Sequence, residues 1–160
     1  MFALSLKGRA LRYLAAREHS RAELERKLAP HLPEDGGAAE LARVLDELAA
    51  KGLLSEARVA ESVLHRRAGR LGAARVLHEL RAKELPQAVI EDAAERLQAT
   101  ELARAQAVWR KKFGQAPADA AGRARQMRFM AQRGFSGDTV RRVLQAAHGG
   151  AEDLDAGLDE

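Results

Sequence analysis

The residues best suited to chemistry in this chain are the lysines and arginines of its last third. Residues 100–148 carry ten Lys and Arg against three Asp and Glu, whereas residues 149–160 carry five acids and no base. Positive charge concentrated in one segment favours a polyanionic partner, with nucleic acid first. The candidate binding residues are Arg110, Lys111, Lys112, Arg123, Arg125, Arg128, Arg133, Arg141 and Arg142.

Two interpretations of this basic set are open from the sequence. The cations could form a strip that faces phosphates, in which case each neutralised phosphate releases counterions and binding weakens steeply with salt. They could equally be ordinary solvated faces of helices. Arg125 and Arg128 lie three residues apart, so these two share a face if the segment is helical.

A second, smaller basic set consists of Arg66, Arg67 and Arg70, at the end of a helix expected in the middle of the chain. Cations there compensate the helix dipole, which is a sufficient explanation, and binding is the alternative. Trp109 and Phe113 lie four residues apart and could stack on nucleic-acid bases. Their apolar neighbours favour packing in the core instead.

No arrangement typical of catalysis or of metal binding appears in the sequence. There is no cysteine, no glycine-rich phosphate loop and no nucleophile elbow. The five histidines lack the spacing and the nearby carboxylates of a metal site; they are His19, His31, His65, His78 and His148. We therefore expect a protein that is not an enzyme and that needs neither a cofactor nor a metal.

The elements that must carry these residues are helices. Aromatic residues make up only 4% of the chain, and no segment alternates apolar and polar residues, so strands are not expected. Leu28, Leu80 and Met130 mark the middle helices of three similar segments. The prediction is an all-α chain of three tandem three-helix units that form an elongated body. The units span residues 1–54, 55–99 and, for the basic unit, 100–148.

Local signals place several helix ends. Ser20 and Glu23 have the spacing of a capping box. The segment Lys51-Gly52-Leu53 is a stop signal, with Leu53 expected to fold back onto the preceding helix. The last unit is expected to begin a new helix at about Thr100.

The acidic residues 149–160 have the composition of a disordered tail. The simpler interpretation is a solubilising end; the alternative is a phosphate mimic that folds over the basic unit and reduces DNA binding. No apolar segment approaches the roughly 18 residues of a membrane span, and the amino terminus lacks a signal-peptide pattern. We expect a soluble, cytoplasmic monomer.

Several short motifs occur in an order and spacing that resemble the RecX family of recombinase regulators. They are Ser20-x-x-Glu23-Leu24, Lys51-Gly52-Leu53-Leu54-Ser55, Arg58-x-Ala60-Glu61-Ser62, Gly72-x-x-x-Val76-x-x-Glu79-Leu80, Lys111-Lys112-Phe113-Gly114 and Phe129-x-x-x-Arg133-Gly134-Phe135-Ser136. The resemblance covers roughly residues 8–147. One departure is Glu84, where the family often has glycine, so strain is expected in a left-handed helix cap.

The resemblance implies three repeats of a three-helix motif and a protein that binds RecA and its filament on single-stranded DNA. It also implies inhibition of the ATPase, strand-exchange and coprotease activities of RecA, and so modulation of recombination, DNA repair and the SOS response. Similar proteins in some cases bind DNA directly, and double-stranded DNA is a further candidate partner. The alternative, from a different class, is a sequence-nonspecific helical DNA-binding protein without a recombinase partner.

Overall fold

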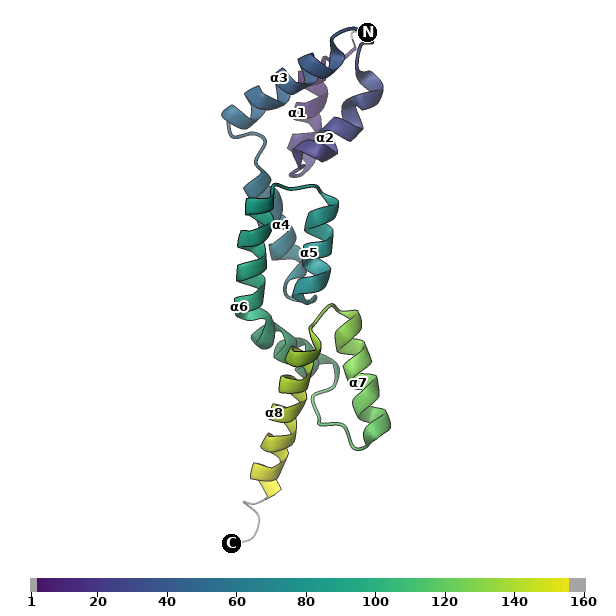
Figure 1. Cartoon of the computed structure of the whole chain (residues 1–160), viewed down its shortest axis with the longest axis vertical. Coiled ribbons are helices and arrows are strands. Elements are labelled where there is room, and N and C mark those ends of the chain that lie inside the picture. The colour runs from purple at the N-terminus through teal and green to yellow at the C-terminus, as the bar shows by residue number, and fades with distance from the viewer. Residues whose placement is uncertain (1–2, 156–160) are drawn as a thin grey trace. The chain divides into compact units, whose positions relative to one another are not determined.

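The structure, a computed structural model, describes residues 3–155, with side chains described up to Gly150. Within these residues all regular structure is helical, which confirms the all-α prediction. The elements are α1 (Leu6–Ala16), α2 (Arg21–Leu28), the 3₁₀ turn η1 (Ala29–His31), α3 (Gly37–Ala50), α4 (Glu56–Arg67), α5 (Ala73–Ala82), α6 (Gln87–Lys112), α7 (Ala120–Gln132) and α8 (Gly137–Asp155) (Figure 1). None of the helices in this described part is long and apolar enough to cross a membrane.

The chain forms two compact units. The amino-terminal unit contains Met1–Val63 and Glu79–Glu91, and the carboxy-terminal unit contains Leu64–His78 and Asp92–Glu160. Helices α4, α5 and α6 each contribute one part to either unit. The three tandem units with boundaries near residues 54 and 99 stay a prediction, because this division cuts the chain at other places.

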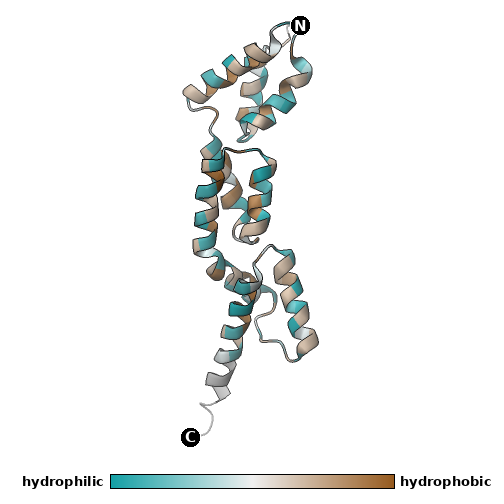
Figure 2. Ribbon diagram, in the orientation of Figure 1, coloured by the Kyte–Doolittle hydropathy of each residue, from teal (hydrophilic) through white to brown (hydrophobic). Residues whose placement is uncertain are grey.

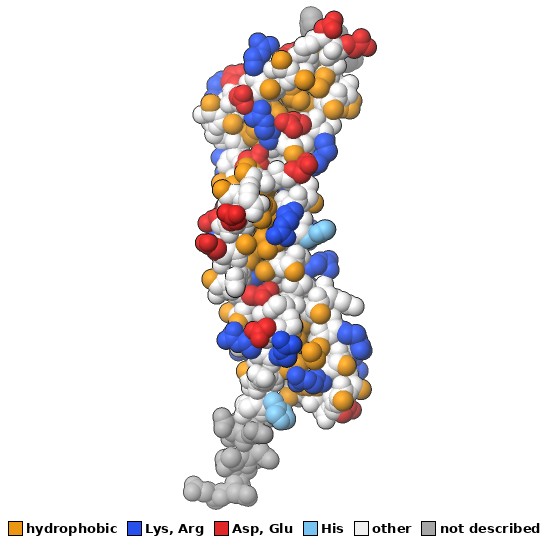
Figure 3. All heavy atoms as spheres, viewed as in Figure 1, with side chains coloured by type: hydrophobic (Ala, Val, Ile, Leu, Met, Phe, Trp, Pro, Cys, Tyr) orange, Lys and Arg blue, Asp and Glu red, His pale blue; other side chains and the backbone are white. Residues whose placement is uncertain are grey.

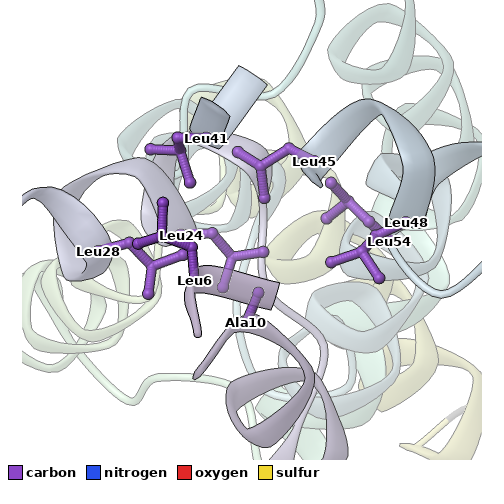
Figure 4. Close-up of a cluster of buried hydrophobic side chains, with 8 residues drawn as sticks. All are labelled: Leu6, Ala10, Leu24, Leu28, Leu41, Leu45, Leu48 and Leu54. Carbon is purple, nitrogen blue, oxygen red and sulfur yellow. The ribbon is translucent and has the colours of Figure 1, made fainter. Parts of the chain in front are cut away.

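Helices α1, α2 and α3 pack around a leucine-rich core in the amino-terminal unit (Figure 4). Its buried side chains are Leu6, Ala10, Leu24, Leu28, Leu41, Leu45, Leu48 and Leu54. Within each helix these residues recur at three- and four-residue spacing, so one stripe of every helix faces the other two. Burying one leucine side chain contributes roughly 2 kcal/mol, so this cluster contributes substantially to the stability of the unit.

A second core joins the end of α6 to α7 and α8 in the carboxy-terminal unit. Its buried side chains are Ala105, Trp109, Met130, Phe135, Val140, Val143 and Leu144. Figure 2 shows hydrophobic and hydrophilic residues alternating around α7 and α8, as expected for helices that bury one face.

Most helix ends follow the predicted signals. The Glu23 amide donates to the Ser20 hydroxyl at 3.1 Å, and the Ser20 amide donates to the Glu23 carboxylate at 3.2 Å, which completes the capping box. Gly52 ends α3 with φ 73°. The expectation for Leu53 is wrong, because its side chain is 46% exposed and the next residue, Leu54, is the one that joins the core.

Glu84 has the backbone conformation that its position predicts. Its φ is 53°, and it is the only residue other than glycine with a positive φ in the described chain. For a residue with a Cβ this left-handed conformation costs about 1–2 kcal/mol. The strain expected from the absence of glycine at this turn is therefore present.

The expectation of a new helix at about Thr100 is wrong, because α6 continues from Gln87 to Lys112. This segment contains neither glycine nor proline, so no residue within it terminates the helix. Figure 1 shows that α6 bends part-way along its length. The Thr100 hydroxyl donates to the Arg96 carbonyl oxygen at 3.2 Å, a side-chain contact that often accompanies a helix bend.

Helix α8 also extends further than the sequence suggested, to Asp155. Residues 149–155 of the expected disordered tail are therefore helical, and residues 156–160 lie outside the described residues. Gly149 and Gly150 each disfavour a helix by about 1 kcal/mol. Neither adopts the positive φ that would end one, so the helix passes through them.

Candidate binding surface on helices α6, α7 and α8

The last turn of α6 carries three of the predicted basic residues, Arg110, Lys111 and Lys112. All three are exposed. The chain leaves the helix at Gly114, whose φ is 71° and whose amide donates to the Trp109 carbonyl oxygen at 3.2 Å. Cations at this position are favoured by the partial negative charge of the last carbonyl groups. The fold therefore accommodates a concentration of positive charge here.

Helix α7 separates the arginines that it carries. The buried stripe of this helix consists of Gly122, Gln126 and Met130. At about 100° per residue, Arg125 and Arg128 lie about 60° apart on one flank, whereas Arg123 lies about 160° from Arg125. All three are exposed. The shared face expected for Arg125 and Arg128 is present, and Arg123 does not belong to it.

Lys112 and Arg125 line the same hollow, which has a volume of about 330 Å³. Phe113, Gln126 and loop residues 115–119 line it as well. Asp119 is in this loop, and its carboxylate accepts an amide from the first turn of α7 at 2.7 Å. Two cations beside one hydrogen-bonded carboxylate leave a net positive charge, which suits an oxyanion such as a phosphate group.

The Phe129 ring contacts two of the cations. Lys112 Nζ lies 5.2 Å from the ring centroid, and the Arg133 guanidinium carbon lies 4.9 Å from it. The Phe113 ring meets Phe129 edge-on, with centroids 5.4 Å apart. Each cation–π contact contributes about 0.5–1 kcal/mol at such a surface site. Lys112 and Arg133 therefore both contact Phe129, although they come from the ends of two different helices.

Trp109 is a core residue, as the sequence favoured. Its side chain is 8% exposed, and its Nε1–H donates to Gln126 Oε1 at 2.9 Å. Gln126 in turn donates to the Gln115 carbonyl oxygen at 3.2 Å. With its polar atom paired and its ring covered, Trp109 cannot stack on a nucleic-acid base. Phe113 is half-buried against Phe129.

Three further cations of the basic set lie on α7 and α8. Arg123 lines a hollow of about 460 Å³ together with Leu144 and Gln145. Arg141 and Arg142 are exposed, and Arg141 lies 3.9 Å from Asp138, one turn earlier. Figure 3 shows Lys and Arg side chains spread over the part formed by α7 and α8, around hydrophobic side chains.

The smaller basic set lies at the end of α4. Arg66 and Arg70 are exposed and Arg67 is half-buried. Arg66 and Arg67 occupy the last turn of the helix, where the dipole favours a cation. None of these three residues lines the hollow beside Lys112 and Arg125 or the hollow beside Arg123.

Arg104 is a structural residue that the sequence did not reveal. Its guanidinium donates to the carbonyl oxygens of Ala68 at 3.0 Å, Leu71 at 2.6 Å and Leu97 at 2.8 Å, and to the Thr100 hydroxyl at 2.9 Å. Burial lowers the pKa of Arg104. The side chain thus connects the bend of α6 to the loop after α4, and the only sequence signal was a cation one position before the buried Ala105.

A buried histidine, His19, lies in the amino-terminal unit. His19 is 1% exposed; its Nδ1 lies 3.0 Å from the Arg17 carbonyl oxygen and its Nε2 lies 2.9 Å from Lys27 Nζ. A neutral ring with the proton on Nδ1 satisfies both contacts. Burial lowers the pKa of His19, and the charges of Arg17 and Lys27 lower it further, against the hydrogen bond to the Arg17 carbonyl.

Glu23, beside His19, is held ionised. Burial raises its pKa, but hydrogen bonds from Arg17 at 2.7 Å, from the Ser20 amide at 3.2 Å and from Lys83 at 3.2 Å outweigh this effect and lower the pKa to about 2. The carboxylate thereby joins the end of α1, the start of α2 and the turn after α5.

No group of three or more potential metal ligands occurs among the described residues.

Comparison with known proteins assigns the chain to a family. The model of the first three-helix domain of RecX matches residues 7–35, and the model of the third matches residues 99–144. A protein of Leptothrix cholodnii named Regulatory protein RecX is 60% identical over 144 residues, which is 90% of each chain. The chain belongs to the RecX family. The RecX protein of Ralstonia nicotianae is 51% identical over 152 residues, 95% of this chain and 94% of its own.

Two solved RecX structures share the fold. The RecX structure from Lactobacillus salivarius superposes with a TM-score of 0.74 at 18% identity, over 89% of this chain and 94% of that one. A second RecX crystal structure gives a TM-score of 0.69 at 19% identity, over 86% and 70%. The RecX relatives are named regulatory proteins, which accords with the expectation of a protein that is not an enzyme.

Proposed function

We propose that this chain regulates the RecA recombinase by binding RecA and its filament on single-stranded DNA. The proposal includes inhibition of the ATPase, strand-exchange and coprotease activities of RecA, and so modulation of recombination, DNA repair and the SOS response. The observation that carries it is 60% identity, over 144 residues, to a protein named Regulatory protein RecX. The protein acts as a cytoplasmic monomer, by binding and without catalysis.

The mechanism that fits such a regulator is a shift in the population of filament states. A protein that binds an inactive arrangement of RecA more tightly than the active one favours the inactive arrangement by the difference in binding free energy. Lys112, Arg125 and Arg133 support a contribution from nearby phosphates, because Lys112 lines the smaller hollow with Arg125 and contacts the Phe129 ring with Arg133. Contacts to phosphates would add affinity that depends on salt.

A second candidate function is sequence-nonspecific DNA binding without a recombinase partner. It is favoured by the exposure of eight of the nine cations of the basic set, which are Arg110, Lys111, Lys112, Arg123, Arg125, Arg128, Arg141 and Arg142. DNA binding of this kind weakens steeply with salt and does not require RecA. The two functions differ in stoichiometry, since a DNA-binding protein must cover the DNA before it affects another protein.

The deciding experiment measures single-strand-dependent ATP hydrolysis by the cognate RecA while this protein is titrated in, with DNA in excess. If the proposal holds, hydrolysis falls at well below one chain per RecA. If hydrolysis falls only when the protein is abundant enough to coat the DNA, the second candidate is correct. No effect at either ratio would contradict both.

A matched control uses the charge variant Lys112→Gln/Arg125→Gln/Arg128→Gln. A filament regulator retains substoichiometric inhibition in this variant at low salt, because its main contacts are with RecA. A protein that acts only by coating DNA loses its effect. The variant leaves every residue of the second core unchanged, so its fold is checked simply by circular dichroism.

A further inference from the structure

Two equivalent hydrogen bonds occur in the two compact units. The buried alanines Ala60 and Ala105 mark matching helices, which makes Glu56 in α4 the counterpart of Glu101 in α6. The Arg21 amide donates to Glu56 Oε1 at 2.9 Å, and the Ala73 amide donates to Glu101 Oε1 at 3.0 Å. Arg21 and Ala73 are the first residues of α2 and α5. We call these contacts the first and the second junction.

The second junction is fully hydrogen-bonded. The other carboxylate oxygen of Glu101 accepts the Thr139 hydroxyl at 2.9 Å. The Gly72 amide donates to the Arg133 carbonyl oxygen at 2.7 Å, and the Ala74 amide donates to the Gly134 carbonyl oxygen at 3.3 Å.

The close approach behind these bonds depends on two glycines. A Cβ on Gly72 would overlap the Gly134 carbonyl group, and a Cβ on Gly134 would overlap the Arg75 side chain. Backbone therefore packs directly on backbone where the start of α5 meets the turn between α7 and α8. Such a contact leaves no room for adjustment by side chains.

The first junction lacks these features. Glu56 Oε2 is buried and has no hydrogen-bond partner among the described residues, and burial raises the pKa of Glu56. The spacing of 50 residues that relates Leu80 to Met130 places Val89 at the position of Thr139, so the hydroxyl donor is missing. The same spacing places Glu84, in its left-handed conformation, at the position of Gly134.

Ion pairs take the place of backbone bonds at the first junction. Lys83 Nζ lies 3.2 Å from Glu23 Oε1, in side chains that are 18% and 10% exposed. Arg26 lies 2.8 Å from Glu84, in side chains that are 57% and 62% exposed. A pair as exposed as the latter contributes little to stability and is weakened by salt.

We propose that the first junction is a joint that opens, so that the start of α2 separates from Glu56 and from the turn between α5 and α6, while the second junction stays closed. There are two structural reasons. Val89 has no hydroxyl group that could donate to Glu56, and the remaining contacts of the junction are ion pairs between side chains. The joint is a property of the fold and goes beyond the proposed function. It gives α1–α3 freedom to reorient when the protein meets a partner.

Two backbone amides report on the junctions directly. The first amide of an α-helix has no acceptor within its own helix, so its protection from hydrogen exchange depends on the glutamate alone. Exchange at Arg21 and Ala73, measured by nuclear magnetic resonance on the full chain, therefore measures the opening of each junction. We expect Arg21 to be protected at least tenfold less than Ala73, each relative to its intrinsic rate.

Reciprocal substitutions test the cause. Val89→Thr supplies the missing hydroxyl and is expected to slow exchange at Arg21 about tenfold, without affecting Ala73. Thr139→Val removes the donor from Glu101 and is expected to accelerate exchange at Ala73 by a similar factor, without affecting Arg21. Val89→Ala is the matched control, because it alters the same side chain without adding a donor and should not slow exchange at Arg21.

The proposal is overturned by equal protection of the two amides in the unsubstituted chain. It is also overturned if Val89→Thr leaves exchange at Arg21 unchanged or accelerates it. Protection of the Leu28 and Leu80 amides, in the last turns of α2 and α5, shows in every variant that the helices themselves remain folded.

Discussion

At the scale of single residues, His19 and Glu23 are two buried titratable groups of the amino-terminal unit. His19 is buried and neutral, and Glu23 is ionised between Arg17 and Lys83. Both groups favour the folded state at neutral pH, but they lose this effect in different ranges of pH. The two residues can therefore be studied separately.

We predict that the free energy of unfolding falls as the pH is lowered through about 6.5, the ordinary pKa of histidine. Because the pKa of His19 is lower in the folded state, the unfolded state binds the proton first, and stability is lost between 6.5 and the folded pKa. Urea unfolding between pH 7 and pH 5 measures this slope. His19→Asn should reduce it, and an unchanged slope in that variant would contradict the assignment.

Glu23 acts only at lower pH. Its carboxylate stabilises the fold above the ordinary pKa of 4.5, and this contribution disappears as the pH falls towards the folded pKa of about 2. Measurements above pH 5 therefore isolate His19 from Glu23.

At the scale of elements, α6 is one of three helices that contribute to both compact units. Its bend coincides with the cluster of carbonyl groups around Arg104. These oxygens lie in the loop after α4 and in α6 itself, so one side chain determines the path of both segments. Replacing it should therefore have a larger effect than replacing an exposed arginine.

We predict that Arg104→Met lowers the free energy of unfolding by about 2–4 kcal/mol. Methionine keeps most of the apolar stem but leaves the Ala68, Leu71 and Leu97 carbonyl groups without this donor, and unsatisfied buried polar groups cost about 1–3 kcal/mol each. Thermal unfolding followed by circular dichroism measures the change. Arg128→Met, at an exposed position, is the matched control, and equal effects of the two substitutions would refute the role of Arg104.

The same scale shows what the sequence could and could not predict. Leu28, Leu80 and Met130, which marked the middle helices, are all fully buried, because periodicity reports directly on which face a helix hides. The continuity of α6 was missed because a single helix can contribute to two compact units without a glycine or proline between its two parts. Arg104 was missed because its acceptors are backbone carbonyl groups, which leave no pattern of residue types.

Of the twelve candidate binding residues, ten are exposed and two, Arg67 and Arg133, are half-buried, but the sequence did not show how they are grouped. A count of about 100° per residue already separates Arg123 from Arg125 within α7. The contact of both Lys112 and Arg133 with the Phe129 ring could not be derived, because it depends on how α6 and α7 pack. Their role in binding stays a prediction.

At the scale of the whole molecule, positive charge is concentrated in residues 100–148 and negative charge in residues 149–160. We predict that Lys112→Gln/Arg125→Gln/Arg128→Gln weakens binding to single-stranded DNA. If all three cations contact phosphates, the slope of log affinity against log salt falls by about 2, at roughly 0.7 per contact. Fluorescence anisotropy at several salt concentrations measures both quantities. An unchanged slope would show that these residues do not face the DNA.

A second prediction at this scale concerns the acidic end of the chain. Deleting residues 151–160 removes five acids and leaves both described cores intact, so DNA affinity at low salt should rise if these acids compete with phosphates. The gain should disappear at high salt, where the charges are screened. Equal affinity of the two forms at low salt would leave the segment with a solubilising role only.

The placement of the two largest aromatic side chains has a practical consequence. The chain contains one tryptophan and one tyrosine, and these lie in different compact units. Trp109 is enclosed and hydrogen-bonded in one, whereas Tyr13 lies 5.6 Å from the His19 ring in the other. The native protein thus contains one spectroscopic reporter per unit. Tryptophan emission and tyrosine absorbance can therefore show whether the two units unfold together or in sequence, with no label attached.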